Sequence, residues 1–216
     1  MSRQETFQEV PYPGRDFAGF PAQKTTATRR KFRAHRVVRG AWFFASEPTE
    51  KDAGRFNLAN PHGTCYLADS VTVAVRERFG PSYAALGMVP NWAAEEFHVT
   101  EVDLNAGLRF ADVAAKTADQ FGVTRELCTM DKYDVPRRWA AMFTALGFDG
   151  IRCPARFSTG YKPDAWALFG EAGAQTWPTY NVTDGVTASE MCGFTVYSTP
   201  RTGMGLSVSL PTGVTP

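Results

Sequence analysis

Three residues between positions 54 and 79 have types and spacing that could act together on a dinucleotide. Arg55 is expected in a loop, Tyr66 in a short apolar strand and Glu77 in a helix. An arginine can pair with a pyrophosphate, an aromatic ring can stack on nicotinamide, and a carboxylate can stabilise positive charge developing on a ribose. These types in this order predict a site that binds NAD and breaks its nicotinamide–ribose bond.

Each of these residues also has an ordinary structural explanation. A helical glutamate usually pairs with a surface arginine, a mid-strand tyrosine usually packs in the core, and a loop arginine is usually solvated. Arg33 is a fourth candidate, because an arginine that faces inward from a strand needs a phosphate or carboxylate partner. The order and spacing of the whole set therefore carry the functional prediction, and no single member does.

Other catalytic chemistries find little support in the sequence. The histidines, His35, His62 and His98, do not fall at metal-ligand spacing, so no metal site is expected. There is no glycine-rich phosphate loop that opens a helix, and no Gly-x-Ser-x-Gly nucleophile motif. No flanking residue argues for a cysteine nucleophile at Cys128 or Cys153.

Composition is that of an ordinary globular protein. The chain has 216 residues, 44% of them hydrophobic and 21% charged, with a formal net charge of +1. This balance predicts neither a nucleic-acid nor a membrane partner. The four cysteines form no close pair, which favours free thiols in a reducing compartment. Because the first 14 residues lack the apolar core of a signal peptide, we expect a cytoplasmic protein.

Hydrophobic patterning and capping predict the elements that must position the candidate residues. Strands are expected at residues 32–38, 64–68, 99–104, 108–113, 150–153, 165–169 and 194–198, with an apolar patch at 42–44, and helices at residues 71–79, 114–121 and 135–146. Asp69 or Ser70 is expected to cap the first helix, which ends at Gly80. Asp134 is expected to cap the last helix.

The helix at 135–146 carries a core stripe of Val135, Trp139, Met142, Phe143 and Leu146. Strands and helices mix along the chain without regular alternation, which predicts an α+β fold: one domain of small mixed or antiparallel sheets with flanking helices. We expect an irregular N-terminal arm at 1–28, a catalytic domain at 29–180 and an extension at 181–216 packed on the same domain, with strand-like sequence at 206–210.

The chain also resembles the RES-domain family, which is named for its arginine, glutamate and serine. The matching segments, in the family's order, are residues 32–36, 54–57, 63–68, 74–79, 138–140, 150–152 and 167–169. The resemblance implies an ADP-ribosyltransferase-like fold and a bacterial toxin that depletes NAD by hydrolysis or phosphorolysis. It also implies a cognate antitoxin as partner, and NAD as a substrate without a further cofactor.

Carried over by position, the resemblance gives each candidate a role. Arg33 would grip the NAD phosphates and Arg55 would assist. Tyr66 would stack on nicotinamide, and Glu77 would be the catalytic carboxylate.

The sequence departs from the family at one position. The family's serine is expected about where Ala155 stands, and Ser158 could supply a hydroxyl to the substrate from a shifted loop. Losing one such hydrogen bond typically costs about 1–3 kcal/mol, which would weaken turnover without abolishing it.

Two other functions stay open. The same residues could transfer ADP-ribose to a macromolecule, or the chain could be a catalytically silent module that binds NAD or a partner protein. Ala155 favours the silent module. The sequence does not settle the acceptor of ADP-ribose, and it leaves open whether the chain forms a homo-oligomer.

Overall fold

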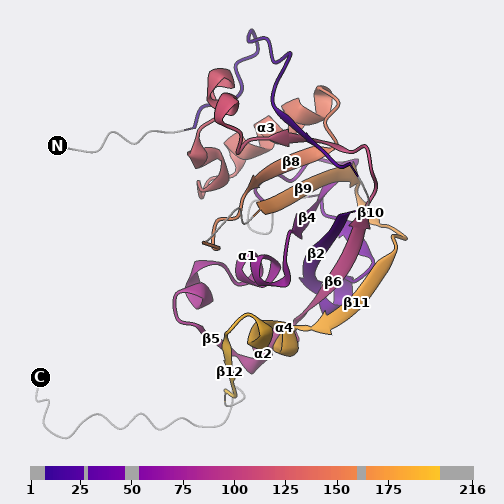
Figure 1. The fold of residues 1–216 in the computed structure, drawn as a ribbon, viewed down its shortest axis with the longest axis vertical. Helices are drawn as coiled ribbons and strands as arrows, with labels where there is room; N and C mark the ends of the chain where they lie inside the picture. Colours follow the sequence, from indigo (N-terminus) through magenta and orange to yellow (C-terminus); the bar gives the residue numbers. More distant parts are fainter. Residues whose placement is uncertain (1–7, 27–28, 47–53, 160–163, 200–216) are drawn as a thin grey trace, which may run out of the picture.

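An eight-stranded sheet runs through the centre of the computed structural model, which describes residues 8–26, 29–46, 54–159 and 164–199 (Figure 1). Its strand order is β1-β7-β8-β9-β4-β2-β6-β11, and the only parallel neighbours in this sheet are β7 and β8. The strands are β1 (Ala22–Lys24), β2 (Arg29–Arg36), β4 (His62–Ala68), β6 (Phe97–Leu104), β7 (Arg109–Asp112), β8 (Gly150–Pro154), β9 (Asp164–Glu171) and β11 (Thr179–Asp184).

Two small sheets and four α-helices complete the described part of the chain. One small sheet pairs β3 (Trp42–Phe44) with β10 (Gly173–Ala174), and the other pairs β5 (Met88–Pro90) with β12 (Thr195–Tyr197). The helices are α1 (Val71–Ala84), α2 (Asn91–Glu95), α3 (Asp134–Ala145) and α4 (Gly185–Met191). The fold is therefore the single α+β domain with mixed sheets and flanking helices that the sequence predicted, although one sheet is larger than expected.

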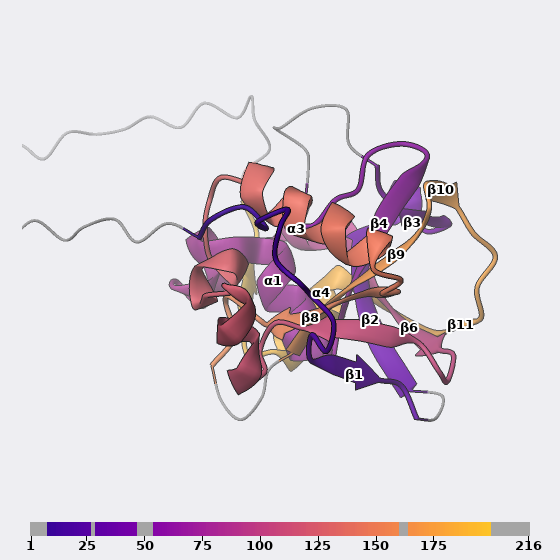
Figure 2. The same ribbon diagram turned by 90° about the horizontal axis from the view of Figure 1, so that it is seen from above.

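The main helices pack on one face of the large sheet (Figures 1 and 2). Alternate residues of a strand point to the same face, and Ala165 and Ala167 of β9 pack against the clusters built by α1 and α3 respectively. The opposite face is covered by β3, whose Phe43 and Phe44 pack with Trp177. The α1 and α3 side of the sheet is where the candidate residues of the site gather.

Helix α1 begins as the sequence predicted. The Ser70 hydroxyl caps it by accepting a hydrogen bond from the Val73 N–H at 3.2 Å. The backbone breaks at Gly80, whose φ of 66° is in the left-handed region that favours glycine. A further helical turn then runs to Ala84, so the predicted end at Gly80 is a kink in a longer segment.

Helix α3 keeps most of its predicted core stripe, since Trp139 and Phe143 are buried and Val135 and Met142 pack, partly buried, against the same cluster. Its buried residues are Pro136, Trp139, Ala140 and Phe143, whereas Leu146 is 40% exposed. The N-terminal arm contacts this helix, where the Trp139 indole donates a hydrogen bond to the Glu9 carbonyl at 2.8 Å. The arm covers one side of the helix, and the sequence pattern of the helix alone did not reveal that cover.

Other predicted details need correction. Asp134 is the first residue of α3 and makes no capping hydrogen bond, because Tyr133 occupies the N-cap position. The predicted helix at 114–121 is a 3₁₀ segment, Lys116–Phe121, which ends at Gly122 with φ 80°. The strands on either side of the turn at 105–107 both form, but β6 and β7 pair with different strands.

Strands β1 and β11 are the two edge strands of the large sheet. Strand β1 pairs with β7, and Phe20 of the arm is buried in the cluster around α3. Residue 180 lies inside β11, which pairs with β6, so the extension that was predicted to start at 181 continues the sheet. The strand-like sequence at 206–210 lies outside the described residues.

All four cysteines are free thiols, and Cys65 and Cys153 are buried as predicted. Within the described residues, no helix has both the length and the apolar character needed to cross a membrane.

Candidate active site

A cavity of about 630 Å³ opens between α1 and the loop that precedes α3, with the large sheet as its floor. Helix α1 contributes Ala74, Glu77 and Arg78, whose spacing of three and four residues places them on one helix face. The other lining segments include the turn at 54–56, Tyr66 and neighbouring residues of β4, Asp131 and Tyr133 before α3, and residues 156–157. Residues 155–159, which follow β8, are called the strap below.

The turn at 54–58 is held on β4 by two side chains that point to the same face of that strand. The Tyr66 hydroxyl accepts from the Phe56 N–H at 2.8 Å and donates to the Asn57 side-chain oxygen at 2.9 Å. Thr64 donates its hydroxyl to the Phe56 carbonyl at 2.8 Å. A Cβ at Gly54 would lie 2.6 Å from the Tyr66 ring, so glycine is needed there for the turn to approach the strand.

Tyr66 divides its roles between its two ends. Its hydroxyl is fixed in the turn, while the residue remains 39% exposed and lines the cavity. Burial raises the pKa of the phenol, which therefore stays protonated as a hydrogen-bond donor at neutral pH. The ring remains free to contact a planar ligand.

Arg55 lines the cavity and, within the described part of the chain, keeps one buried hydrogen-bond donor without a protein partner. One terminal nitrogen lies 3.5 Å from the Met130 carbonyl, and the guanidinium lies 5.4 Å from the centre of the Tyr133 ring. Its Nε is buried and has no hydrogen-bond partner among the described residues. Because a buried donor without a partner is costly, an anion at this position would be stabilised.

Glu77 is a partly buried carboxylate that the strap holds in place. The Phe157 N–H donates to its Oε1 at 2.8 Å, and the Arg156 N–H also contributes. Burial raises the pKa of Glu77, and these N–H groups and the charges of Arg55 and Arg156 oppose that rise. The carboxylate is thus oriented in a cavity that limits its hydration.

The structure does not bring Arg33 into this group. Strand parity turns its side chain to the opposite face of the sheet, where the guanidinium lies 4.2 Å from the centre of the Phe43 ring. It donates to the carbonyls of Gly40 at 2.7 Å, Arg39 at 3.3 Å and Trp42. Arg33 therefore satisfies its donors by fixing the turn between β2 and β3, and it does not line the cavity.

Neither Ala155, which stands where the family's serine is expected, nor Ser158 lines the cavity. Ala155 is buried in the apolar cluster around α1, where its methyl group takes the place of the expected serine. The Ser158 hydroxyl is buried without a hydrogen-bond partner among the described residues. In this conformation, the strap contributes main-chain N–H groups to the site rather than a hydroxyl.

Four ionisable lining residues were missed by sequence reasoning: Arg78, Asp131, Tyr133 and Arg156. Arg78 could have been found, because it follows Glu77 and lies four residues after Ala74. The other three come from segments far apart in the sequence that only the sheet brings together. Arg156 donates to the Asp131 carboxylate at 2.8 Å, which links the strap to the loop before α3.

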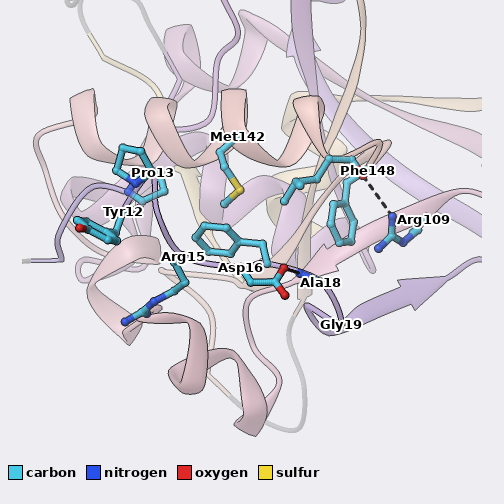
Figure 3. A pocket seen from close by; sticks show the side chains of 12 residues that line it. Tyr12, Pro13, Arg15, Asp16, Ala18, Gly19, Arg109, Met142 and Phe148 are labelled. Atoms are coloured by element: carbon cyan, nitrogen blue, oxygen red, sulfur yellow. Dashed lines mark hydrogen bonds between the residues drawn. The ribbon is translucent and has the colours of Figure 1, made fainter.

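A second cavity, of about 660 Å³, lies between the N-terminal arm and α3 (Figure 3). Its polar side chains serve local structure: Asp16 accepts from the Ala18 N–H at 2.7 Å, and Arg109 stacks on Phe148 at 3.9 Å. No comparable set of arginine, tyrosine and buried carboxylate meets there. Among the described residues, no group of three or more His, Cys, Asp or Glu could hold a metal ion.

Comparisons with known proteins agree with this architecture. The chain is similar in fold to a chain of the crystal structure of the M. tuberculosis MbcT–MbcA toxin–antitoxin complex, with a TM-score of 0.55 and 16% identity. The match covers 78% of this chain and 91% of that chain. No curated protein matches at a significant level. The family model of the RES domain matches residues 27–185, which is most of the chain, and the protein therefore belongs to the RES-domain family.

Proposed function

We propose that this protein is a toxin that cleaves the nicotinamide–ribose bond of NAD in the cavity between α1 and the strap. The observation that carries the proposal is the meeting of Arg55, Tyr66 and Glu77 in one cavity, although they come from a turn, a strand and a helix. Membership of the RES-domain family supports the same reaction class. We expect the protein to act in the cytoplasm.

Each residue has a role that its surroundings suit. The guanidinium of Arg55, which lines the cavity, would bind the pyrophosphate. The open ring of Tyr66 would stack on the nicotinamide. The Glu77 carboxylate, oriented by the Phe157 N–H, would lie beside the ribose and stabilise its positive charge. We assign the phosphate contact to Arg55 rather than Arg33, because Arg33 faces the other side of the sheet.

The proposed reaction follows the chemistry of glycosidic cleavage. The bond between ribose C1′ and the pyridinium nitrogen breaks, and its electron pair leaves with neutral nicotinamide. The oxocarbenium-like ribose then accepts water or phosphate at C1′. If water is the acceptor, Glu77 can take its proton, since burial has raised the pKa of this carboxyl toward the range useful for a general base.

The test is incubation of the purified chain with NAD, with and without phosphate, and chromatographic separation of the products. Nicotinamide release is expected from the wild type and is expected to be lost in Glu77→Gln, which keeps the side-chain shape and an oxygen for the Phe157 N–H. Glu190→Gln is the matched control, because Glu190 is an exposed glutamate of α4 that does not line the cavity. Full activity of Glu77→Gln would overturn the catalytic role, and the second product would identify the acceptor.

A binding module without turnover is the second candidate, and the buried Ala155 is the observation that favours it. The position expected to carry a serine hydroxyl presents only a methyl group to an apolar cluster. This function predicts that NAD raises the melting temperature while nicotinamide is not released. Transfer of ADP-ribose to a macromolecule would instead leave a label from NAD on protein or nucleic acid.

We also propose an antitoxin as protein partner. The support is that the structural neighbour is a toxin crystallised with its antitoxin. Expression of the wild-type chain is then expected to arrest bacterial growth, whereas the Glu77→Gln variant is expected to permit it. Equal growth arrest by both variants would separate toxicity from the proposed chemistry.

A further inference from the structure

Arg156 forms an ion pair at the cavity that is more exposed than the ion pairs of Arg152. Its Nη2 lies 2.8 Å from Oδ1 of Asp131, and the two side chains are 24% and 86% exposed respectively. By contrast, Arg152 pairs with Asp112 and Asp164, whose side chains are only 13% and 11% exposed. Asp131 therefore keeps most of its hydration in the pair, and its carboxylate loses little when the partner leaves.

Arg156 is also fixed close to the proposed reaction centre by its own backbone. The N–H of the next residue, Phe157, donates to Glu77 at 2.8 Å, and the Arg156 charge acts on the same carboxylate. The Arg156 side chain lines the cavity together with Arg55 and Asp131. Two guanidinium groups, one from the 54–58 turn and one from the strap, thus flank one carboxylate.

A dinucleotide pyrophosphate offers two phosphate groups to this pair of arginines. Arg55 supplies one guanidinium, and a second guanidinium would give each phosphate its own charged, planar partner. Arg156 has the same fork of donors, and its present partner is a solvated carboxylate that a phosphate with equal or greater charge can replace. Arg156 is therefore a second cavity arginine that could bind a phosphate, and Asp131 is the group that holds its guanidinium in the free protein.

We propose that Arg156 is the second pyrophosphate-binding residue and that Asp131 competes with the substrate for it. This inference rests on the proposed function, since it assigns a role within the same NAD site. In the free protein Arg156 pairs with Asp131, and on binding it exchanges the carboxylate for a phosphate oxygen. Asp131 thereby lowers the affinity of the site while it keeps the arginine oriented.

The exchange requires two substitutions in one ion pair to act in opposite directions. Arg156→Ala removes charge-assisted hydrogen bonds to phosphate, and we expect affinity for the pyrophosphate to fall about 10- to 100-fold. Asp131→Asn removes the competitor, and we expect affinity to rise about two- to sixfold, which is the inverse of the free-arginine fraction for an exposed pair. A purely structural ion pair would give two changes of the same sign.

The experiment is calorimetric titration of ADP-ribose into the full chain, since this ligand carries the pyrophosphate but has no nicotinamide bond to break. Adenosine, which lacks phosphates, is the ligand control. Asp134→Asn is the matched variant control, because Asp134 is exposed three residues after Asp131 and does not line the cavity. Arg156→Lys keeps the charge without the planar fork and is expected to fall between Arg156→Ala and the wild type.

The outcomes separate this inference from the proposed function. Weaker binding by Arg156→Ala together with tighter binding by Asp131→Asn supports the exchange. Unchanged affinity in Arg156→Ala, or weaker binding in Asp131→Asn, overturns it while NAD cleavage by the wild type stands. Absence of both ADP-ribose binding and NAD binding in the wild type overturns the proposed function itself. Because Asp131 is exposed, its variant tests the exchange even if Arg156→Ala fails to fold.

Discussion

Tyr66→Phe tests whether the tyrosine hydroxyl, rather than the ring, builds the site. The substitution keeps the ring that lines the cavity but removes the oxygen that binds the Phe56 N–H at 2.8 Å and the Asn57 side chain at 2.9 Å. Both partners are almost fully buried, so water cannot replace the lost bonds. Leaving a buried polar group unpaired costs about 1–3 kcal/mol of unfolding free energy.

For a chain of this size, that cost corresponds to a melting temperature lowered by about 2–12 °C. The same loss loosens the turn that carries Arg55, so KM for NAD is expected to rise more than kcat falls. Tyr12→Phe is the control, because its exposed hydroxyl makes no hydrogen bond within the described residues. An unchanged melting temperature and an unchanged KM in Tyr66→Phe would refute the claim that this hydroxyl holds the turn.

Three further outcomes are expected. Gly54→Ala places a Cβ against the Tyr66 ring, and KM should rise in steady-state kinetics, while Gly40→Ala, which has a negative φ and whose added Cβ meets only His35 at 3.7 Å, leaves it unchanged. Burial raises the pKa of Glu77 above the ordinary 4.5, so activity should be lost in a pH–rate profile as pH falls through that raised pKa. The contribution of Glu77 to stability has the opposite sign, because the folded state binds its proton more tightly than the unfolded state does. Melting temperatures should therefore fall as pH rises through the same pKa. Arg152→Leu leaves the buried Asp164 and the partly buried Asp112 carboxylates unpaired and should lower the unfolding free energy in denaturant titration by about 3–5 kcal/mol.

The local parts of the site could be predicted from the sequence because they are nearly contiguous. A glycine-marked turn, a strand and a capped helix follow one another between residues 54 and 79, so Arg55, Tyr66 and Glu77 lie on successive elements. Helical spacing from Ala74 also placed Glu77 beside the core. Their convergence follows from short connections, and little long-range information was needed.

The face of the sheet on which Arg33 lies could not be predicted from the sequence. Polar Lys31 and Arg33 are buried on one face of β2, while apolar Phe32 is only partly buried on the α1 face, so alternation of polar and apolar residues does not reveal which face meets the cavity. Arg156 follows β8 and Asp131 precedes α3, and the two residues meet only in the folded chain, 25 residues apart in sequence. Such contacts depend on strand order, which neither hydrophobic period nor capping signals encode.

Phe157 donates its main-chain N–H to a side chain that titrates, and this makes one amide proton a reporter of the site. The amides of β4 lie between β2 and β9 and should exchange with deuterium only when the sheet opens. The Phe157 amide is instead protected by the Glu77 carboxylate, which becomes a weaker acceptor when it binds a proton. Its exchange rate, corrected for intrinsic pH dependence, therefore follows the ionisation of Glu77 in the intact chain without any substrate present.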